Sequence, residues 1–281
     1  MKKVIILFLF VSSLFALELN TNKTINANTI LVSLEKSNIE NPKLTFLNKN
    51  YDFFENPFKK DSYYILLPIS YYEKPKKEPI IVSYFENGKK VFKGKNLYIN
   101  KGEYKTETLS VSSSKVELSQ EDKQRVKKEF EEAKEIYTKK HPNILWKDDF
   151  IYPIDSKITS DFGNARLFNN TLRSYHTGTD FRAPIGTPIK ASNSGIVRVA
   201  KDRFYGGKSV VIDHGHGVFS GYFHLDEFKV KLGDFVKRGD IIALSGNTGR
   251  STGPHLHFMF KIDDVIVNPL QAIDILNSLK N

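Results

Sequence analysis

Short apolar runs separated by polar turns fill the stretch from residue 29 to residue 111. Six of these runs are rich in β-branched and aromatic residues, and they cover residues 30–34, 44–47, 63–69, 80–85, 97–99 and 106–111. Turn-forming pairs such as Asn87-Gly88 lie between them. Short strands at this spacing are typical of a β-sandwich, so residues 17–116 are predicted to form an accessory β domain with an immunoglobulin-like fold.

One amphipathic segment follows, in residues 117–142. Ser119 and, three residues later, Asp122 form a pattern typical of a helix N-terminus. Apolar side chains then recur at helical spacing, at Val126, Phe130, Ala133 and Tyr137. Pro142 ends the pattern, because the residue before a proline avoids helical dihedral angles. We predict a connecting helix between two β domains, with its face of Glu and Lys in solvent.

The remainder, residues 143–281, has a different texture. Fourteen of the 17 glycines lie between Gly163 and Gly253. Strand-like runs alternate with these glycines, at residues 195–200, 209–213, 218–223, 241–245, 256–262 and 265–267. The pattern predicts an antiparallel β domain with tight connections, and therefore a mainly β protein.

The first 16 residues read as an export signal. Lys2 and Lys3 precede an apolar run over residues 4–15, and the small residue Ala16 precedes a polar stretch. This run is too short for a helix to span a bilayer core of roughly 30 Å, but it suits a cleaved signal peptide. An uncleaved N-terminal anchor is the alternative. Cleavage after Ala16 predicts a periplasmic protein with no stable membrane insertion.

Composition narrows the choice of chemistry. The chain has 281 residues, enough for two domains, and no cysteine, which excludes disulfides, thiolate metal sites and cysteine nucleophiles. The formal charge is +10, or +8 without Lys2 and Lys3, and it is spread along the chain rather than gathered in an Arg-rich stripe. We therefore expect no nucleic-acid partner, but a mild preference for a polymer that bears carboxylates.

All but one of the seven histidines lie between His176 and His257. His176 and Asp180 are four residues apart, a spacing that puts both side chains on one side of a strand or helical turn, but such pairs are common on surfaces. His255 and His257 share one face of a predicted strand, where they are either a metal or proton-transfer site or two exposed imidazoles. His224 ends another apolar strand, and on its own it suggests only a strand-end residue.

Three motifs together resemble a known family. In chain order they read HTGTDFRAPIGTPIKAS, IDHGHGVFSGYFHL and SGNTGRSTGPHLHF, within residues 176–258. They are similar to the lysostaphin-type (LytM-domain) zinc metallopeptidases, which cleave peptide cross-links in bacterial peptidoglycan. The resemblance covers about residues 150–270. It is greatest to the longer Gram-negative members, which carry a signal peptide and an accessory β domain before a peptidase domain with a narrow zinc-containing groove.

The resemblance implies a role for each motif residue. His176, Asp180 and His257 would hold one Zn²⁺ per chain and leave a fourth position for water. His224 and His255 would serve catalysis, one as a general base and the other as a stabiliser of the oxyanion, with the assignment left open. His214 and His216, by contrast, are interpreted as structural.

The resemblance also implies an activity. It predicts a D,D-endopeptidase that cleaves D-Ala to meso-diaminopimelate cross-links and also acts as a D,D-carboxypeptidase, in cell-wall remodelling and the control of cell shape. Peptidoglycan peptide stems are the expected partner of a monomeric enzyme, and Arg173 and Lys208 are candidate contacts for their carboxylates. The alternative is an inactive LytM-type activator of other hydrolases. The accessory domain is expected either to inhibit the peptidase or to position it on the wall.

Overall fold

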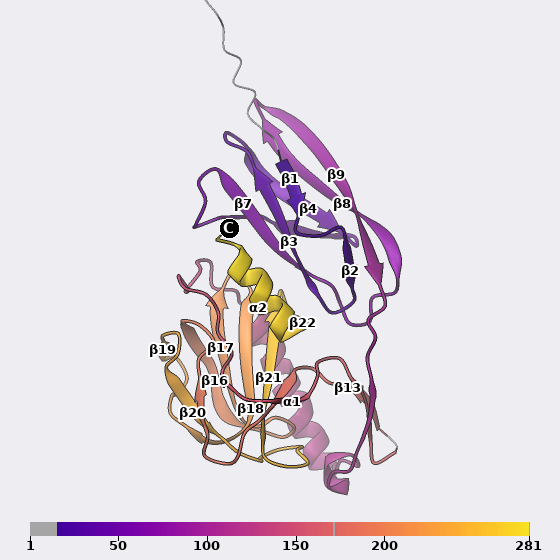
Figure 1. The fold of residues 1–281 in the computed structure, drawn as a ribbon, viewed down its shortest axis with the longest axis vertical. Coiled ribbons are helices and arrows are strands. Elements are labelled where there is room, and N and C mark those ends of the chain that lie inside the picture. The colour runs from indigo at the N-terminus through magenta and orange to yellow at the C-terminus, as the bar shows by residue number, and fades with distance from the viewer. Residues whose placement is uncertain (1–15, 171, 281) are drawn as a thin grey trace, which may run out of the picture.

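The computed structural model describes residues 16–170 and 172–280, and it shows a mainly β protein, as the sequence predicts. Two β-rich parts lie one above the other, with the C-terminal helix α2 between them and the long helix α1 behind the lower part (Figure 1). The predicted signal segment lies outside the described residues except for Ala16, which begins strand β1. Within the described part of the chain, neither helix is long and apolar enough to cross a bilayer.

The N-terminal part contains two sheets, with strand orders β1-β3-β7-β6 and β2-β9-β8-β4-β5. Their strands are β1 (Ala16–Leu19), β2 (Lys23–Ile25), β3 (Thr29–Glu35), β4 (Glu40–Phe46), β5 (Lys49–Asp52), β6 (Phe54–Glu55), β7 (Ser62–Pro68), β8 (Lys76–Glu86) and β9 (Lys89–Asn100). Alternate residues of β8, namely Ile80, Val82 and Tyr84, are buried together with Val32 and Leu67 of the other sheet. The two sheets therefore share one core, which is a sandwich arrangement. Its immunoglobulin-like topology stays a prediction.

The strand predicted at residues 106–111 has a different partner from the one expected. It forms β10 (Thr106–Leu109), which pairs in parallel with β12 (Ala165–Phe168) of the C-terminal part and not with the sandwich. The chain runs from β9 down the side of the C-terminal part before it turns into α1 (Figure 1). Local β propensity could predict the strand, but its pairing depends on a segment some 60 residues away.

Helix α1 spans Gln120–Thr138, after a short 3-10 turn η1 (Ser113–Lys115). Ser119 is its N-cap, and the Ser119 hydroxyl accepts a hydrogen bond of 3.0 Å from the amide of Asp122, which satisfies one of the free N–H groups at the helix end. Tyr137 is buried against Phe219 of the C-terminal sheet. Phe130, which the periodicity placed on the same face, is 70% exposed, because the helix contacts the sheet mainly through its C-terminal half.

The C-terminal part is built on one large sheet with the order β11-β14-β21-β18-β17-β16-β19, which β15, β20 and β22 extend, and on the hairpin β12-β13. Its strands are β11 (Ile158–Ser160), β12 (Ala165–Phe168), β13 (Leu172–Tyr175), β14 (Thr179–Arg182), β15 (Pro188–Lys190), β16 (Gly195–Arg203), β17 (Gly207–Gly215), β18 (Val218–Phe228), β19 (Phe235–Val236), β20 (Ile241–Ser245), β21 (His255–Ile262) and β22 (Val265–Val267).

Helix α2 (Pro269–Ser278) closes the chain, although the strand-like texture before it predicted no helix there. Pro269 begins the helix, and the side chain of Asn268 caps the amides of Leu270 and Gln271. The helix buries its apolar face in the core of the C-terminal part. The cap and the proline are local signals, and they would have been sufficient to predict the helix.

The two parts share a core. Leu31, Tyr64 and Leu66 of the sandwich belong to the same apolar cluster as α2 and the C-terminal sheet. The Tyr64 hydroxyl lies 2.7 Å from Nδ1 of His216, and the side-chain amide of Gln271 in α2 bonds both backbone groups of Thr29. The sandwich is thus packed firmly against the C-terminal part.

Candidate metal centre

Strand pairing brings the first and third motifs of the sequence together. Strand β14 runs antiparallel to β21, with Asp180 directly opposite His257 and Phe181 opposite Leu256. Directly paired residues of neighbouring strands point to the same face of a sheet. His176 precedes β14 by three residues and turns its ring toward the same point.

Three side chains converge there. Nε2 of His176 and Nδ1 of His257 each lie 2.8 Å from Oδ1 of Asp180, and the two nitrogens are 3.0 Å apart. All three residues are buried. Among the described residues, this is the one group of three His, Asp or Glu side chains whose ligand atoms converge within 4.8 Å.

The hydrogen bonding of His176 tests whether these residues fit a metal. Nδ1 of His176 lies 2.7 Å from the carbonyl oxygen of Asp161, which can only accept, so this nitrogen carries the ring proton. In the neutral ring Nε2 therefore offers a lone pair, directed at a carboxylate oxygen that also has only lone pairs to offer. Two acceptors at this distance repel each other unless a positive charge lies between them, and a bound metal ion supplies that charge. Two imidazoles and a carboxylate are a common ligand set for catalytic zinc, so the residues present fit that ion.

The other oxygen of Asp180 is bound as well. Oδ2 accepts a hydrogen bond of 2.8 Å from Arg166, whose Nε lies 3.1 Å from a carboxylate oxygen of Glu107. Burial on its own raises the pKa of Asp180, but the close contacts with the rings of His176 and His257 outweigh it and hold that pKa well below its ordinary value. Asp180 is thus an anion fixed at both oxygens. Arg166 links it to Glu107 of β10.

His224 and His255 lie beside this group with a shared arrangement. Nδ1 of His224 is 2.7 Å from the carbonyl oxygen of Thr248, and Nδ1 of His255 is 2.7 Å from that of Gly253. Each carbonyl holds the ring proton on Nδ1, which leaves Nε2 free to accept a proton. The ring centroids are 4.8 Å apart, and Nε2 of His255 is 3.7 Å from Oδ1 of Asp180.

The backbone at His224 is held in an uncommon conformation. Its φ is +60°, in the left-handed region that few residues other than glycine adopt, and its amide bonds the carbonyl of Gly206 at 2.8 Å. Burial, with smaller contributions from His255 and His257, lowers the pKa of His224 to about 3. The ring is therefore neutral at physiological pH.

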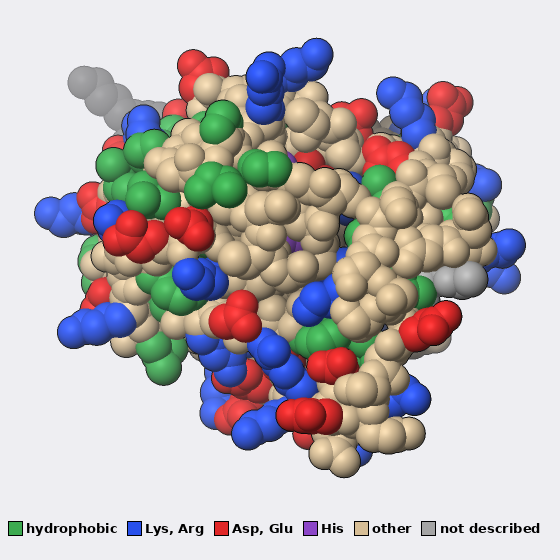
Figure 2. Space-filling view, turned by 90° about the horizontal axis from the view of Figure 1, so that it is seen from below, with side chains coloured by type: hydrophobic (Ala, Val, Ile, Leu, Met, Phe, Trp, Pro, Cys, Tyr) green, Lys and Arg blue, Asp and Glu red, His purple; other side chains and the backbone are tan. Residues whose placement is uncertain are grey.

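Two adjoining hollows open onto these residues. The first, which we call the Tyr205 hollow, has Tyr175, Tyr205 and His257 in its lining, and the second, the Glu107 hollow, has Glu107, Asp180 and His255. Arg166, Phe168, His224 and Arg250 line both. On the face of the molecule in Figure 2, histidine side chains show only at the bottom of recesses near the centre, and acidic and basic side chains are interspersed around them.

His214 and His216 lie outside this group, in line with the structural role predicted for them. His214 is fully buried and contacts the Ser194 carbonyl and the Ser220 hydroxyl, both at 2.8 Å. His216 stacks on Phe54 of the sandwich with ring centroids 3.8 Å apart. Burial lowers the pKa of both imidazoles to about 4.

Sequence reasoning missed three charged residues of the site: Glu107, Arg166 and Arg250. Glu107 and Arg166 lie outside the motifs, and Arg250 lies within the third motif but had no partner visible in the sequence. The two cations that were proposed for substrate contact, Arg173 and Lys208, do not line either hollow, and the Lys208 ammonium bonds the carbonyl of Asp226 instead.

The fold and the buried His-Asp-His group define a zinc metallopeptidase domain. Residues 174–269 match Peptidase family M23, so this part of the chain is a domain of that family. The resemblance noted in the sequence is therefore confirmed.

Relatives with assigned activities align over the C-terminal part. The chain is 47% identical over 124 residues to the peptidoglycan DD-endopeptidase ShyA of Vibrio cholerae, which covers 43% of this chain and 29% of ShyA. It is 43% identical over 118 residues to the DD-carboxypeptidase/endopeptidase Mpg of Neisseria meningitidis, which covers 42% of this chain and 27% of Mpg. The chain thus spans less than a third of the length of these relatives.

One solved structure is similar over both parts of the chain. A crystal structure from Pseudomonas aeruginosa that bears the description peptidase M23 covers 90% of this chain and 96% of its own, with 26% identity and a TM-score of 0.66. The arrangement of a β-rich N-terminal part before the C-terminal domain therefore also occurs in that structure.

Proposed function

We propose that this protein is a periplasmic peptidoglycan D,D-endopeptidase that hydrolyses D-Ala to meso-diaminopimelate cross-links and also removes terminal D-Ala as a D,D-carboxypeptidase. The observation that carries the proposal is the complete set of side chains at one point of the groove: His176, Asp180 and His257 converge, and His224 and His255 face them. The activities named for ShyA and Mpg support the choice of substrate.

In this proposal His176, Asp180 and His257 hold the zinc ion. When bound there, zinc polarises the scissile carbonyl and makes a water molecule a better nucleophile at neutral pH. Arg166 fixes the carboxylate of Asp180, and the Asp161 carbonyl fixes the ring of His176, so both groups are oriented before a ligand arrives.

His224 and His255 handle the protons. Each can accept a proton at Nε2, because its Nδ1 already donates to a backbone carbonyl. One ring takes the proton of the attacking water at Nε2 and passes it to the leaving amine. The other ring, in its protonated form, donates from Nε2 to the oxyanion of the tetrahedral intermediate. Separate His224→Asn and His255→Asn variants assign the two roles through their pH-rate profiles.

The setting of the enzyme is part of the proposal. Residues 1–16 direct export and are removed, and the mature chain acts as a monomer on the peptide stems of the wall during remodelling that affects cell shape. The relatives' role as peptidoglycan peptidases supports an extracytoplasmic site of action.

A digest of purified sacculi with residues 17–281 tests the proposal. Cross-linked dimers should disappear and monomers should accumulate. A chelator should abolish the conversion by removing the metal, and His257→Ala should abolish it by removing a metal ligand. His141→Ala is the matched control. The imidazole of His141 bonds the nearby Asn143 backbone, away from the site, so this variant should leave digestion unchanged. Dimers that persist with zinc-loaded protein would contradict the proposal.

A further inference from the structure

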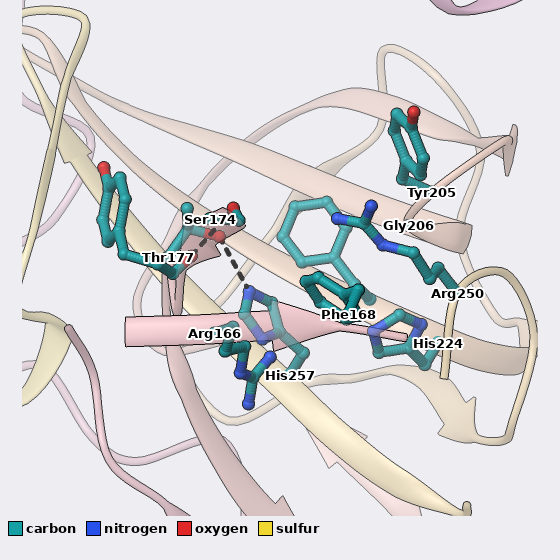
Figure 3. A pocket seen from close by; sticks show the side chains of 11 residues that line it. Arg166, Phe168, Ser174, Thr177, Tyr205, Gly206, His224, Arg250 and His257 are labelled. Atoms are coloured by element: carbon teal, nitrogen blue, oxygen red, sulfur yellow. Dashed lines mark hydrogen bonds between the residues drawn. The ribbon is translucent and has the colours of Figure 1, made fainter. Parts of the chain in front are cut away.

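Arg250 is placed where the two hollows meet. It follows β20 in the loop that leads to His255, and it lines both the Tyr205 hollow and the Glu107 hollow, as His224 does. In the close view its guanidinium reaches into the pocket between Tyr205 and Phe168 (Figure 3). A group bound by Arg250 would therefore lie within the same recess as the catalytic imidazole.

The guanidinium of Arg250 packs against the rings of Phe168 and Tyr205. It lies 4.2 Å from the ring centroid of Phe168 and 4.3 Å from that of Tyr205, and the backbone amide of Arg250 bonds the Tyr205 carbonyl at 2.8 Å. Contacts between a cation and ring faces leave the N–H groups at the edge of the guanidinium unused. The arrangement fixes the plane of a bidentate donor without occupying its donors.

The other cation of the groove is in a different situation. Arg166 lines the same two hollows, but it is paired with both Glu107 and Asp180. Within residues 16–170 and 172–280, no carboxylate pairs with the guanidinium of Arg250, although this side chain is only partly exposed. A partly buried cation without a carboxylate is incompletely compensated, and a carboxylate from outside the chain would complete it.

The proposed substrates supply a carboxylate at one constant position. In a D-Ala to diaminopimelate cross-link, the carbon that carries the scissile nitrogen also carries a free carboxylate. In an uncross-linked pentapeptide stem, the terminal D-Ala carries its carboxylate on the equivalent carbon. Endopeptidase and carboxypeptidase substrates therefore present the same group beside the bond that is cleaved.

We propose that Arg250 binds this carboxylate and so selects bonds whose leaving side bears one. The inference rests on the proposed function and identifies the part of the substrate that the groove recognises. Bidentate pairing of the guanidinium with the carboxylate would hold the scissile amide in the recess that His224 also lines. A single contact then accounts for both activities in one groove.

The test uses two cross-linked dimers that differ only in whether the carboxylate next to the scissile nitrogen is free or amidated, together with a pentapeptide stem and its C-terminal amide. Zinc-loaded residues 17–281 should cleave each acid about 10- to 100-fold faster in kcat/KM than its amide, the range expected for loss of a charge-assisted pair. Arg250→Met should lose that factor on the acids and leave the amides unchanged, so that it no longer discriminates.

Two further variants complete the design. Arg250→Lys keeps the charge but not the bidentate geometry and should restore part of the preference. Arg173→Met removes an exposed cation that lines neither hollow and should behave as the unmodified protein does. Zinc content and thermal unfolding, measured for every variant, separate loss of recognition from loss of folding or of the metal.

The outcomes are distinct. An unmodified protein that cleaves acids and amides equally, or an Arg250→Met variant that still prefers the acid, would overturn the inference while the proposed peptidase activity stands. Zinc-loaded protein that cleaves none of the four peptides and leaves sacculi intact would refute the proposed function, and the inference with it.

Discussion

Backbone carbonyls decide which nitrogen each imidazole of the site offers. The carbonyls of Asp161, Thr248 and Gly253 hold the Nδ1 protons of three different histidines, so that Nε2 of each faces the groove. His257 differs, because its Nδ1 is the atom that points at Asp180. At the scale of the residue, the chemistry therefore depends on backbone carbonyls of loops and not on further titratable side chains.

The buried His214 makes stability depend on pH. Burial lowers its folded-state pKa from 6.5 to about 4, so below pH 6.5 the unfolded chain binds the proton more readily than the folded one. The contribution of His214 to the free energy of unfolding is fully present above pH 6.5. It decreases by about 3 kcal/mol in total as the pH falls toward 4. Urea unfolding of residues 17–281 at pH 7 and pH 5 should show a loss in which this residue accounts for about 2 kcal/mol.

The variant His214→Gln identifies this contribution. It should be less stable at pH 7, because the contacts with Ser194 and Ser220 are weakened, but its stability should change less between pH 7 and pH 5. An identical pH dependence in the two proteins would contradict the assignment.

The pairing of β14 with β21 is the element that assembles the ligands. It sets Asp180 opposite His257, and β18 then pairs with β21 so that Phe223, next to His224, also faces His257. A shift of one residue in either strand pairing would turn a metal-ligating side chain to the other face of the sheet. The metal centre is therefore a property of the sheet register.

Gly178 allows this register. A Cβ at this position would lie 2.3 Å from the carbonyl oxygen of Phe258 and 2.8 Å from Nε2 of His257. Gly178→Ala should force β14 away from β21, cost about 3 kcal/mol of unfolding free energy and weaken zinc binding. Gly94→Ala is the control, because its nearest contact would be an ordinary 3.5 Å. Equilibrium unfolding and zinc titration measure both effects, and an unaltered zinc affinity in Gly178→Ala would contradict this account.

At the scale of the whole molecule, the N-terminal part contributes to the site. Glu107 of β10 contacts Ser160, Asn164 and Arg166, and the last of these binds Asp180. Beyond the site, Tyr64 contacts His216 and Gln271 contacts Thr29 across the shared core. In this structure β10 forms a wall of the Glu107 hollow, and through Arg166 it supports Asp180, a candidate metal ligand.

Removal of the N-terminal part tests this support. A fragment of residues 143–281 should be less stable and less active than residues 17–281, since it lacks β10 and exposes part of the shared core. Glu107→Gln in the longer chain separates the two effects. It should lower zinc affinity about 10-fold with little change in the melting temperature, because it weakens the hold on Arg166 alone.

The matched control is Glu103→Gln, an exposed acid on the same segment. Activity and metal affinity are measured for all four proteins. A fragment that is more active than the longer chain would show that the N-terminal part inhibits the enzyme, which is the other role expected for it.

Most of the strands and the helix α1 follow from local patterns, because alternation, turn residues and caps act over a few neighbours. The motifs likewise indicated which histidines and which aspartate to consider, since their spacing reflects strand faces. Helix α2 was missed although its signals at Asn268 and Pro269 are local. The partner of β10 and the exposure of Phe130 could not be predicted, because each depends on what another segment places nearby.

The sequence by itself determined the mainly β fold, the position of the peptidase domain and the candidate residues of its metal centre. Only the tertiary structure decided which ring nitrogens face the groove and that Glu107 supports Asp180 through Arg166. It also decided that, among the residues the structure describes, Arg166 pairs with two carboxylates and Arg250 with none. The physical reason is distance along the chain. Hydrogen bonds and ion pairs between residues tens of positions apart have no local pattern, and they exist only once the strands have paired.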